Sequence, residues 1–142
     1  MIYTEMTKIA LKICFDAHKD QTDKTGLPYI FHPFHLAEQM DTEKEVCAAL
    51  LHDVVEDTPL TFDDLENMGI SRDVTDTLRL LTHSDDDDYF EYVTKIKADP
   101  CAVKVKLADL RHNSDLSRFA EPTEKDIARA EKYKKAIVIL SE

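Results

Sequence analysis

Glycine is nearly absent from this sequence. Only Gly26 and Gly69 occur among 142 residues. A P-loop or a dinucleotide-binding fingerprint needs several glycines within one turn, so neither can be present. The same shortage disfavours an all-β fold, because the tight turns of such a fold require glycine. Tryptophan is also absent, and charged residues make up 33% of the chain, which is typical of a soluble, mostly helical protein.

Basic residues are few beside the acidic ones. The chain has 18 Lys and Arg against 29 Asp and Glu, which gives a formal net charge of −11. A surface that binds nucleic acid needs clustered Lys and Arg to displace counterions. The basic residues here are scattered, and the largest group is the pair Lys134-Lys135. We therefore expect no nucleic-acid partner. A small phosphorylated ligand would need a local source of positive charge, which a metal ion can supply.

Long apolar runs are missing as well. No stretch of about 18 apolar residues occurs, so we expect no membrane span. Residues 1–5 show no basic region followed by an apolar run, so we expect no signal peptide. Cys14, Cys47 and Cys101 are odd in number and widely spaced among apolar neighbours. This pattern favours reduced, buried thiols in a cytoplasmic protein.

Helical spacing of apolar residues runs through most of the chain, without strand-like alternation of useful length. Helix-start signals include Thr42 with Glu45 three residues on, Thr61 with Asp64, and a proline after Asp99. The fold class predicted is all-α, one domain over residues 1–142 built as a bundle of roughly seven helices. The helices are expected at about 4–19, 33–40, 42–56, 61–69, 71–81, 100–113 and 123–140.

The acidic run 85–88 is the one low-complexity feature. It lacks the alternating oxygen ligands, central glycine and terminal glutamate of an EF-hand loop. Four aspartates suit the positive end of a helix dipole. We therefore expect a solvated helix start here and no metal site.

Three other segments contain residues that could bind a metal ion or take part in catalysis. His32 lies between Pro28 and Pro33, and two further segments are 52–57 and 106–113. A lone histidine on an apolar face is more often a satisfied core residue than a ligand, and a lone His-Asp pair often arises by chance. The three segments together are far more specific, and they favour one connected site over unrelated structural residues.

The segment 52–57 is acidic at the end of an apolar helix. On a continuous helix His52 would align with Glu56, and Asp53 with Asp57. Three carboxylates there oppose the helix dipole, so a compensating divalent cation is a good candidate. In the third segment Asp109 needs a partner if it is buried among its apolar neighbours.

Two histidines and two aspartates offer a mixed nitrogen and oxygen ligand set without thiolate. This composition argues against structural zinc and suits a catalytic ion such as Mn or Fe. The candidate ligands are His32, His52, Asp53 and Asp109.

The order and content of these segments resemble the HD-domain metal-dependent phosphohydrolases. The resemblance is closer to the (p)ppGpp hydrolase domain of RelA/SpoT proteins and to the small alarmone hydrolases, and it covers about residues 5–120. Nothing in the chain resembles the synthetase domain of the long RelA/SpoT proteins. The matching motifs are Ala17-His18-Lys19, Lys24-Thr25-Gly26, Pro28-Tyr29-Ile30-Phe31-His32-Pro33, the segments 48–58 and 105–109, and His112-Asn113.

The resemblance implies an all-α HD fold and hydrolysis of the 3′-pyrophosphate of (p)ppGpp to give GDP or GTP. It implies Mn²⁺ at the four candidate ligands, and another divalent transition metal would suit them too. It implies that Glu56 and Asp57 orient and activate the attacking water. It also implies that Lys24 and Asn113 contact the nucleotide, while Tyr29 is expected to form a wall of the site.

Two positions depart from the family pattern. The family has an arginine that packs on guanine where this chain has Asp23, and a carboxylate there cannot stack and should repel phosphates. Leu110-Arg111 replaces the family's Arg-Leu, which turns the arginine about 100° around the helix. These departures keep open a different nucleotide or phosphoester as substrate.

A non-catalytic module that senses a nucleotide or a metal is another alternative. Glu56 and Asp57 argue against it, because a sensor needs only the ligands. The sequence leaves the oligomeric state open.

The remaining histidines have structural interpretations. We expect His18 and His35 to pack or hydrogen-bond, and His83 to lie at a helix end where its charge suits the dipole. His112 is expected to support its neighbour Asp109 without being a ligand.

Overall fold

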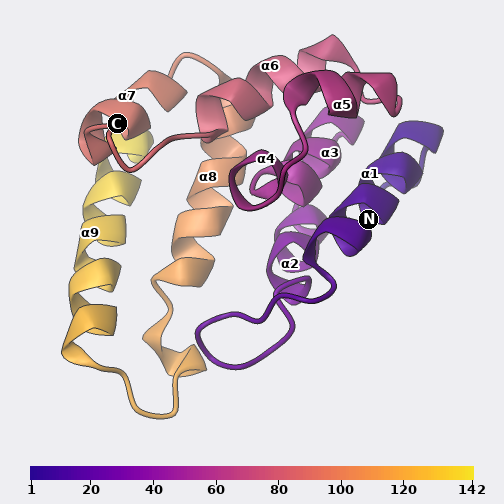
Figure 1. Ribbon diagram of the computed structural model, residues 1–142. Helices are drawn as coiled ribbons and strands as arrows, with labels where there is room; N and C mark the ends of the chain where they lie inside the picture. The colour runs from indigo at the N-terminus through magenta and orange to yellow at the C-terminus, as the bar shows by residue number, and fades with distance from the viewer.

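A computed structural model describes all residues, 1–142, and contains nine α-helices and one short 3₁₀ helix. Figure 1 shows their arrangement. The only strand-like pairing is an isolated bridge between Thr22 and Pro28, so the all-α prediction is confirmed. The helices are α1 (Glu5–His18), α2 (Phe31–Glu38), α3 (Glu43–Leu51), α4 (Val54–Asp57), α5 (Phe62–Asn67), α6 (Arg72–Leu81), α7 (Tyr89–Ile96), α8 (Pro100–Asn113), η1 (Leu116–Arg118) and α9 (Glu124–Ser141).

Side-chain caps start most of these helices where the sequence predicts. Asp99 accepts hydrogen bonds from the first amides of α8, and a proline follows it. Thr61 and Asp64 form the expected capping box of α5. At α3 the box is incomplete, because the Glu45 carboxylate accepts from the Asp41 amide instead of the Thr42 amide.

The helix count was underestimated for two reasons. The helix start expected at the acidic run 85–88 is present, with Asp88 as the N-cap of α7, but the helices expected by range do not include α7. The helix expected over 42–56 is in fact two helices, α3 and α4, separated by His52 and Asp53. The Nδ1–H of His52 donates to the Ala49 carbonyl at 2.7 Å. In an unbroken helix that carbonyl would accept the Asp53 amide, so the imidazole competes with helix continuation.

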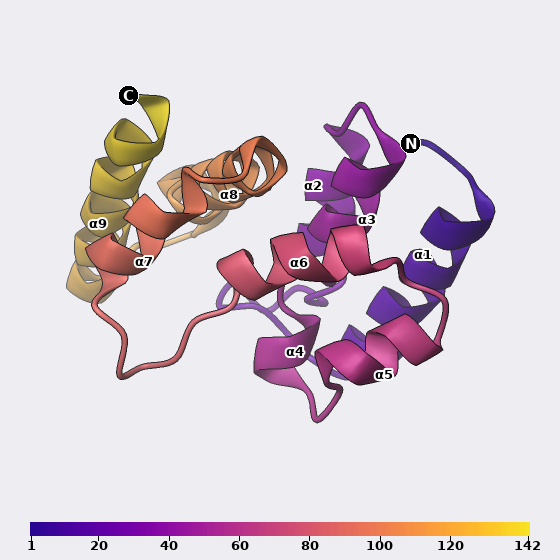
Figure 2. The ribbon, with the colours of Figure 1, turned by 90° about the horizontal axis from the view of Figure 1, so that it is seen from above.

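Helix α3 is the centre of the packing. It contacts α1, α2, α6 and α8, and all six of its residues from Val46 to Leu51 are buried. Helix α9 packs along α8 and α7 at the other side of the molecule (Figures 1 and 2). A core of 27 buried residues draws on helices from α1 to α9. Burial of this apolar surface is the main force that holds α2, α3 and α8 together.

Two connections meet at one end of the molecule. The α1–α2 loop and the segment from η1 to α9 lie together at the bottom of Figure 1. An ion pair between Asp23 and Arg118 joins them at 3.1 Å.

No helix is both long enough and apolar enough to span a bilayer. All three cysteines are free thiols, and Cys101 is only half-buried.

Candidate functional site

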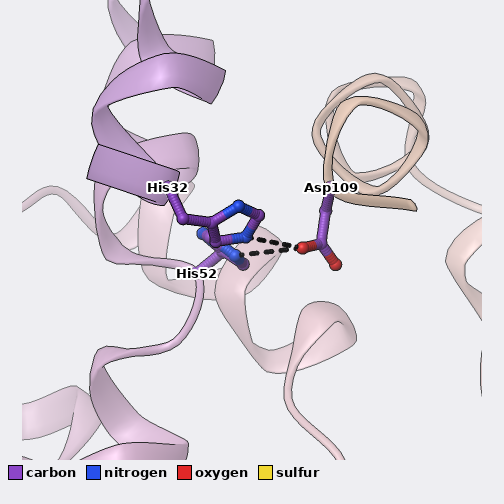
Figure 3. A group of neighbouring side chains, drawn as sticks. All are labelled: His32, His52 and Asp109. Atoms are coloured by element: carbon purple, nitrogen blue, oxygen red, sulfur yellow. Dashed lines mark hydrogen bonds and ion pairs between the residues drawn. The ribbon is translucent and has the colours of Figure 1, made fainter. Parts of the chain in front are cut away.

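Three buried side chains from three segments converge on one point. His32 lies on α2, His52 follows α3, and Asp109 lies on α8 (Figure 3). The Nε2 atoms of His32 and His52 are 2.9 Å and 3.5 Å from Asp109 Oδ1. Each residue offers a ligand atom, and these atoms all lie within 4.8 Å of one another. We call this set the His/His/Asp cluster; it could hold a metal ion.

The donor chemistry of His52 fits a metal ion. Because its Nδ1–H donates to the Ala49 carbonyl, Nε2 of the neutral ring carries a lone pair. That nitrogen is fully buried and makes no well-aligned hydrogen bond, yet it lies 3.0 Å from Asp53 Oδ2. A lone pair facing carboxylate oxygens is repulsive unless a cation lies between them. Burial lowers the pKa of His52, but Asp53 and Asp109 raise it well above its ordinary value, so a ring without a metal ion would carry a proton at Nε2, the atom that a metal ion would bind.

His32 is oriented by a second histidine. Its Nδ1 is 2.7 Å from Nδ1 of His112, and the two rings stack with centroids 5.0 Å apart. Burial, followed by the charge of His32, lowers the pKa of His112 to about 4, so His112 is neutral near pH 7 and can accept this hydrogen bond. The expectation that His112 supports Asp109 is therefore wrong, because it supports His32.

Asp109 is the most heavily hydrogen-bonded member. Its Oδ1 accepts from the Asn113 amide at 2.9 Å, and its Oδ2 pairs with the Lys106 ammonium at 2.9 Å. Burial raises the pKa of Asp109, but Lys106 and then His32 outweigh it and hold that pKa well below its ordinary value. The carboxylate thus stays charged inside the protein, as a metal ligand must.

Asp53 lies at the edge of the His/His/Asp cluster. It is not among the three residues with mutually close ligand atoms, but it contacts His52 Nε2 and accepts a hydrogen bond from the Tyr29 hydroxyl. Burial raises the pKa of Asp53, and His52 more than offsets this, bringing the pKa to about 2. Tyr29, which is expected to form a wall of the site, therefore also holds the candidate ligand Asp53 in place.

Glu56 and Asp57 point to different places. Asp57 borders a cavity together with Asp53, whereas Glu56 contacts His83. The expected alignment of His52 with Glu56 on one helix face is wrong, because the helix is interrupted between them. Burial, and then the charge of Asp53, raises the pKa of Asp57. A carboxylate with a raised pKa is a better proton acceptor near neutrality.

The cavity beside Asp53 has a volume of about 480 Å³. The residues predicted to contact a nucleotide, Lys24, Asn113 and Tyr29, all line it. We call this cavity the cleft. The lining residues are Thr22, Asp23, Lys24, Thr25, Tyr29, Asp53, Asp57, Asn113, Arg118, Phe119, Arg129 and Tyr133.

Sequence reasoning missed the part of the cleft contributed by η1, its following residue and α9. Arg129 and Tyr133 are four residues apart on α9 and so share a face, a spacing that the sequence does contain. The sequence alone does not tell which face of α9 meets the cleft. No local sequence pattern marks Arg118 as a residue of the cleft, because its partner Asp23 is 95 residues away.

Asp23 is not a free negative charge. One oxygen pairs with Arg118, and the other accepts from the amides of Thr25 and Leu27. Burial raises the pKa of Asp23, but hydrogen bonds from the Thr25 hydroxyl and from these two amides, and then the charge of Arg118, lower it below its ordinary value. The expectation that this carboxylate simply repels phosphates is therefore corrected, because its charge is already balanced.

Lys24 is the cation of the cleft without a pairing partner. It forms no ion pair, whereas Arg129 is bound to Asp126 at 3.1 Å. Burial, and then the charge of Arg129, lowers the pKa of Lys24, so two like charges lie near each other. An anion between them would relieve this repulsion.

No family model matches the chain, but individual proteins do. It is 33% identical over 118 residues to the bifunctional (p)ppGpp synthase/hydrolase SpoT of Escherichia coli K12, which covers 73% of this chain and 17% of SpoT. It is 31% identical over 139 residues to a guanosine-3′,5′-bis(diphosphate) 3′-pyrophosphohydrolase of Aquifex aeolicus, covering 89% of this chain and 20% of that protein. The chain thus spans a fifth or less of these curated relatives.

A solved structure also matches. It is described as a metazoan orthologue of SpoT that hydrolyses ppGpp and plays a role in starvation responses. The TM-score is 0.80 at 25% sequence identity, and the match covers 99% of this chain and 88% of the other.

Proposed function

This chain is an HD-type relative of the (p)ppGpp hydrolases, and from that premise we propose that it removes the 3′-pyrophosphate of (p)ppGpp. The products are GDP or GTP and pyrophosphate. One observation carries the proposal: the His/His/Asp cluster adjoins, through Asp53, a cleft that holds Asp57, a carboxylate with a raised pKa, and an unpaired lysine. That arrangement combines an anion-binding surface with the means to activate water.

Mn²⁺ is the proposed cofactor, held by His32, His52, Asp53 and Asp109, and another divalent transition metal would fit the same ligands. When bound, it supplies Lewis acidity and positive charge at the reacting phosphoryl group. The orphaned Nε2 of His52 and the cluster's two histidines and one carboxylate support this choice.

The carboxylates of the chain handle the proton. The water oxygen bonds to the phosphorus attached to the ribose 3′ oxygen, that P–O bond breaks, and the 3′ oxygen takes up a proton. Asp57, which faces the cleft and has a pKa raised by burial, accepts the proton that the water loses. Glu56 assists by orienting the water.

The cations of the cleft bind the substrate. Lys24 and Arg129 would contact phosphates, and Asn113 lies where it can link Asp109 to the nucleotide. Tyr133 and Phe119 offer aromatic faces on which a base can stack. We also propose that residues 1–142 act as one domain, in the cytoplasm, on a small phosphorylated nucleotide and without a nucleic-acid partner.

The test is direct. Purified protein loaded with Mn²⁺ is incubated with ppGpp, and pyrophosphate release is measured against a sample stripped with chelator. We expect release that depends on the metal. Turnover of another nucleotide but not of ppGpp would overturn the alarmone assignment and keep the hydrolase. Metal binding without turnover of any phosphoester would overturn both and favour a sensor.

A further inference from the structure

His83 holds one oxygen of Glu56 with two donors. The Oε1 atom of Glu56 is 2.7 Å from the His83 amide nitrogen and 3.1 Å from His83 Nδ1. The contact joins α4 to the segment after α6, 27 residues along the chain. His83 lies directly after the Thr82 C-cap of α6, at a helix end as expected, and its ring contacts Glu56.

The position of the His83 ring is fixed by aromatic packing. It stacks on Tyr92 with centroids 4.3 Å apart and planes at 23°, and the edge of Tyr89 meets it at 6.0 Å. Tyr92 is itself anchored, since its hydroxyl donates to the Leu81 carbonyl at 2.7 Å. A ring held this way keeps its Nδ1 directed at Glu56 without a large loss of entropy on forming the bond.

Tyr92 also contacts a residue that holds a member of the His/His/Asp cluster. The Lys106 ammonium lies 5.4 Å from the centre of the Tyr92 ring, and it pairs with Asp109. Tyr92 therefore contacts both the residue that holds Glu56 and the residue that holds Asp109. Glu56 and the His/His/Asp cluster are placed by one packed unit.

We propose that His83 is a positioning residue: by donating twice to Oε1 of Glu56, it leaves Oε2 as the oxygen free to orient the attacking water. The inference rests on the proposed role of Glu56 in hydrolysis. Carboxylates positioned in this way lose activity when the second donor is removed, because small misplacements of a reacting group are costly.

Two variants separate hydrogen bonding from packing. His83→Asn keeps a side-chain donor near the place of Nδ1 but removes the stacked ring, whereas His83→Phe keeps an aromatic ring and removes the side-chain donor; both keep the backbone amide donor. We expect His83→Phe to lower kcat for pyrophosphate release by about tenfold to a hundredfold with little change in KM. We expect His83→Asn to restore most of that loss. Thermal unfolding checks that both variants are folded.

The opposite pattern would overturn the proposal. If His83→Phe keeps the kcat of the wild type, or if Asn and Phe lower it equally, the hydrogen bond does not position Glu56. A second readout does not depend on turnover: in a ¹³C NMR titration, the Glu56 pKa should rise in His83→Phe and stay near the wild-type value in His83→Asn. An inactive wild type would refute the proposed function alone, and an unchanged titration in His83→Phe would refute the side-chain hydrogen bond from His83 to Glu56.

Discussion

The His/His/Asp cluster and the cleft share a border at Asp53, yet they are built in opposite ways. In the cluster the side chains are buried and their outer atoms are bonded: His52 to Ala49, His32 to His112 and Asp109 to Lys106. The cleft is lined by a loop, η1 and α9, and it keeps Lys24 without an ion-pair partner. In the cluster only Nε2 of His52 still lacks a partner, whereas the cleft has several interactions left to make.

Because of this difference, substitutions in the two regions should have different effects on stability and on substrate affinity. Removing a bonded group from the buried cluster leaves its partners unsatisfied, so stability and activity should fall together. Removing a free charge from the cleft leaves nothing unsatisfied, so affinity should fall alone. The predictions below test that separation, from the largest effect to the smallest.

Asp109→Ala should have the largest effect. It leaves the buried ammonium of Lys106 without its counter-charge, and such a loss costs about 3–5 kcal/mol of unfolding free energy. Metal binding and pyrophosphate release should disappear as well. Urea unfolding and metal content measure the two effects, with Asp86→Ala on the exposed acidic run as the control. Normal stability in Asp109→Ala would show that the cluster is not the bonded unit described.

Lys24→Ala should act on affinity alone, whereas Arg129→Ala should lower affinity and also break the ion pair with Asp126. Each removes a charge-assisted contact to phosphate, so KM should rise about tenfold to a hundredfold. Unfolding free energy should change by less than about 0.5 kcal/mol for Lys24→Ala, which has no pairing partner. Lys125→Ala, an exposed lysine on the same helix as Arg129, is the control and should change neither quantity. If Lys24→Ala lost as much stability as Asp109→Ala, the proposed difference between the cluster and the cleft would be wrong.

The ion pair of Asp23 and Arg118 lies between the two extremes. It belongs to the cleft but is already paired, with side chains 13% and 20% exposed. A double-mutant cycle with alanine at each position should give a coupling of about 0.5–1 kcal/mol in unfolding free energy. The single variants should also raise KM, because Arg118 lines the cleft. A coupling of zero would mean that this bridge does not hold η1 against the α1–α2 loop.

Asp99 at the start of α8 serves as a reference outside both regions. Burial raises its pKa, but hydrogen bonds from Thr77 and from the first amides of α8 hold it below its ordinary value. A lowered pKa stabilises the fold above the unfolded-state pKa, and this contribution disappears as pH falls through the folded-state pKa. Asp99→Asn should therefore cost about 0.5 kcal/mol at neutral pH and less in acid. Urea unfolding across that range measures it, and kcat should not change; a cost independent of pH would contradict the charge argument.

The sequence predicted much of the cluster because its residues lie in short motifs. Local patterns indicate His32, His52 and Asp109 as ligands, and the fold brings them together. Helix starts such as Thr61 and Asp99 were predictable too, since a cap acts within three residues.

The rest depended on contacts that no local pattern encodes. The apolar periodicity of 42–56 runs through His52, so only the bond of its ring to Ala49 reveals the break. The pairing of Asp23 with Arg118 and of Glu56 with His83 joins segments that meet only after the helices have packed. Helix α9 has residues fit for the cleft, but its orientation is decided by α7 and α8.

The break after α3 also makes His52 an internal reporter. Because Nδ1–H occupies the carbonyl of Ala49, the imidazole is locked in one tautomer, and Nε2 is left as its only nitrogen open to change. In ¹⁵N-detected spectra, the Nε2 resonance should shift when an ion enters, while the Nδ1 proton exchanges slowly and keeps its position. The Nε2 resonance of His52 would then report the fraction of protein molecules that hold a metal ion, without a substrate and without a coupled enzyme assay.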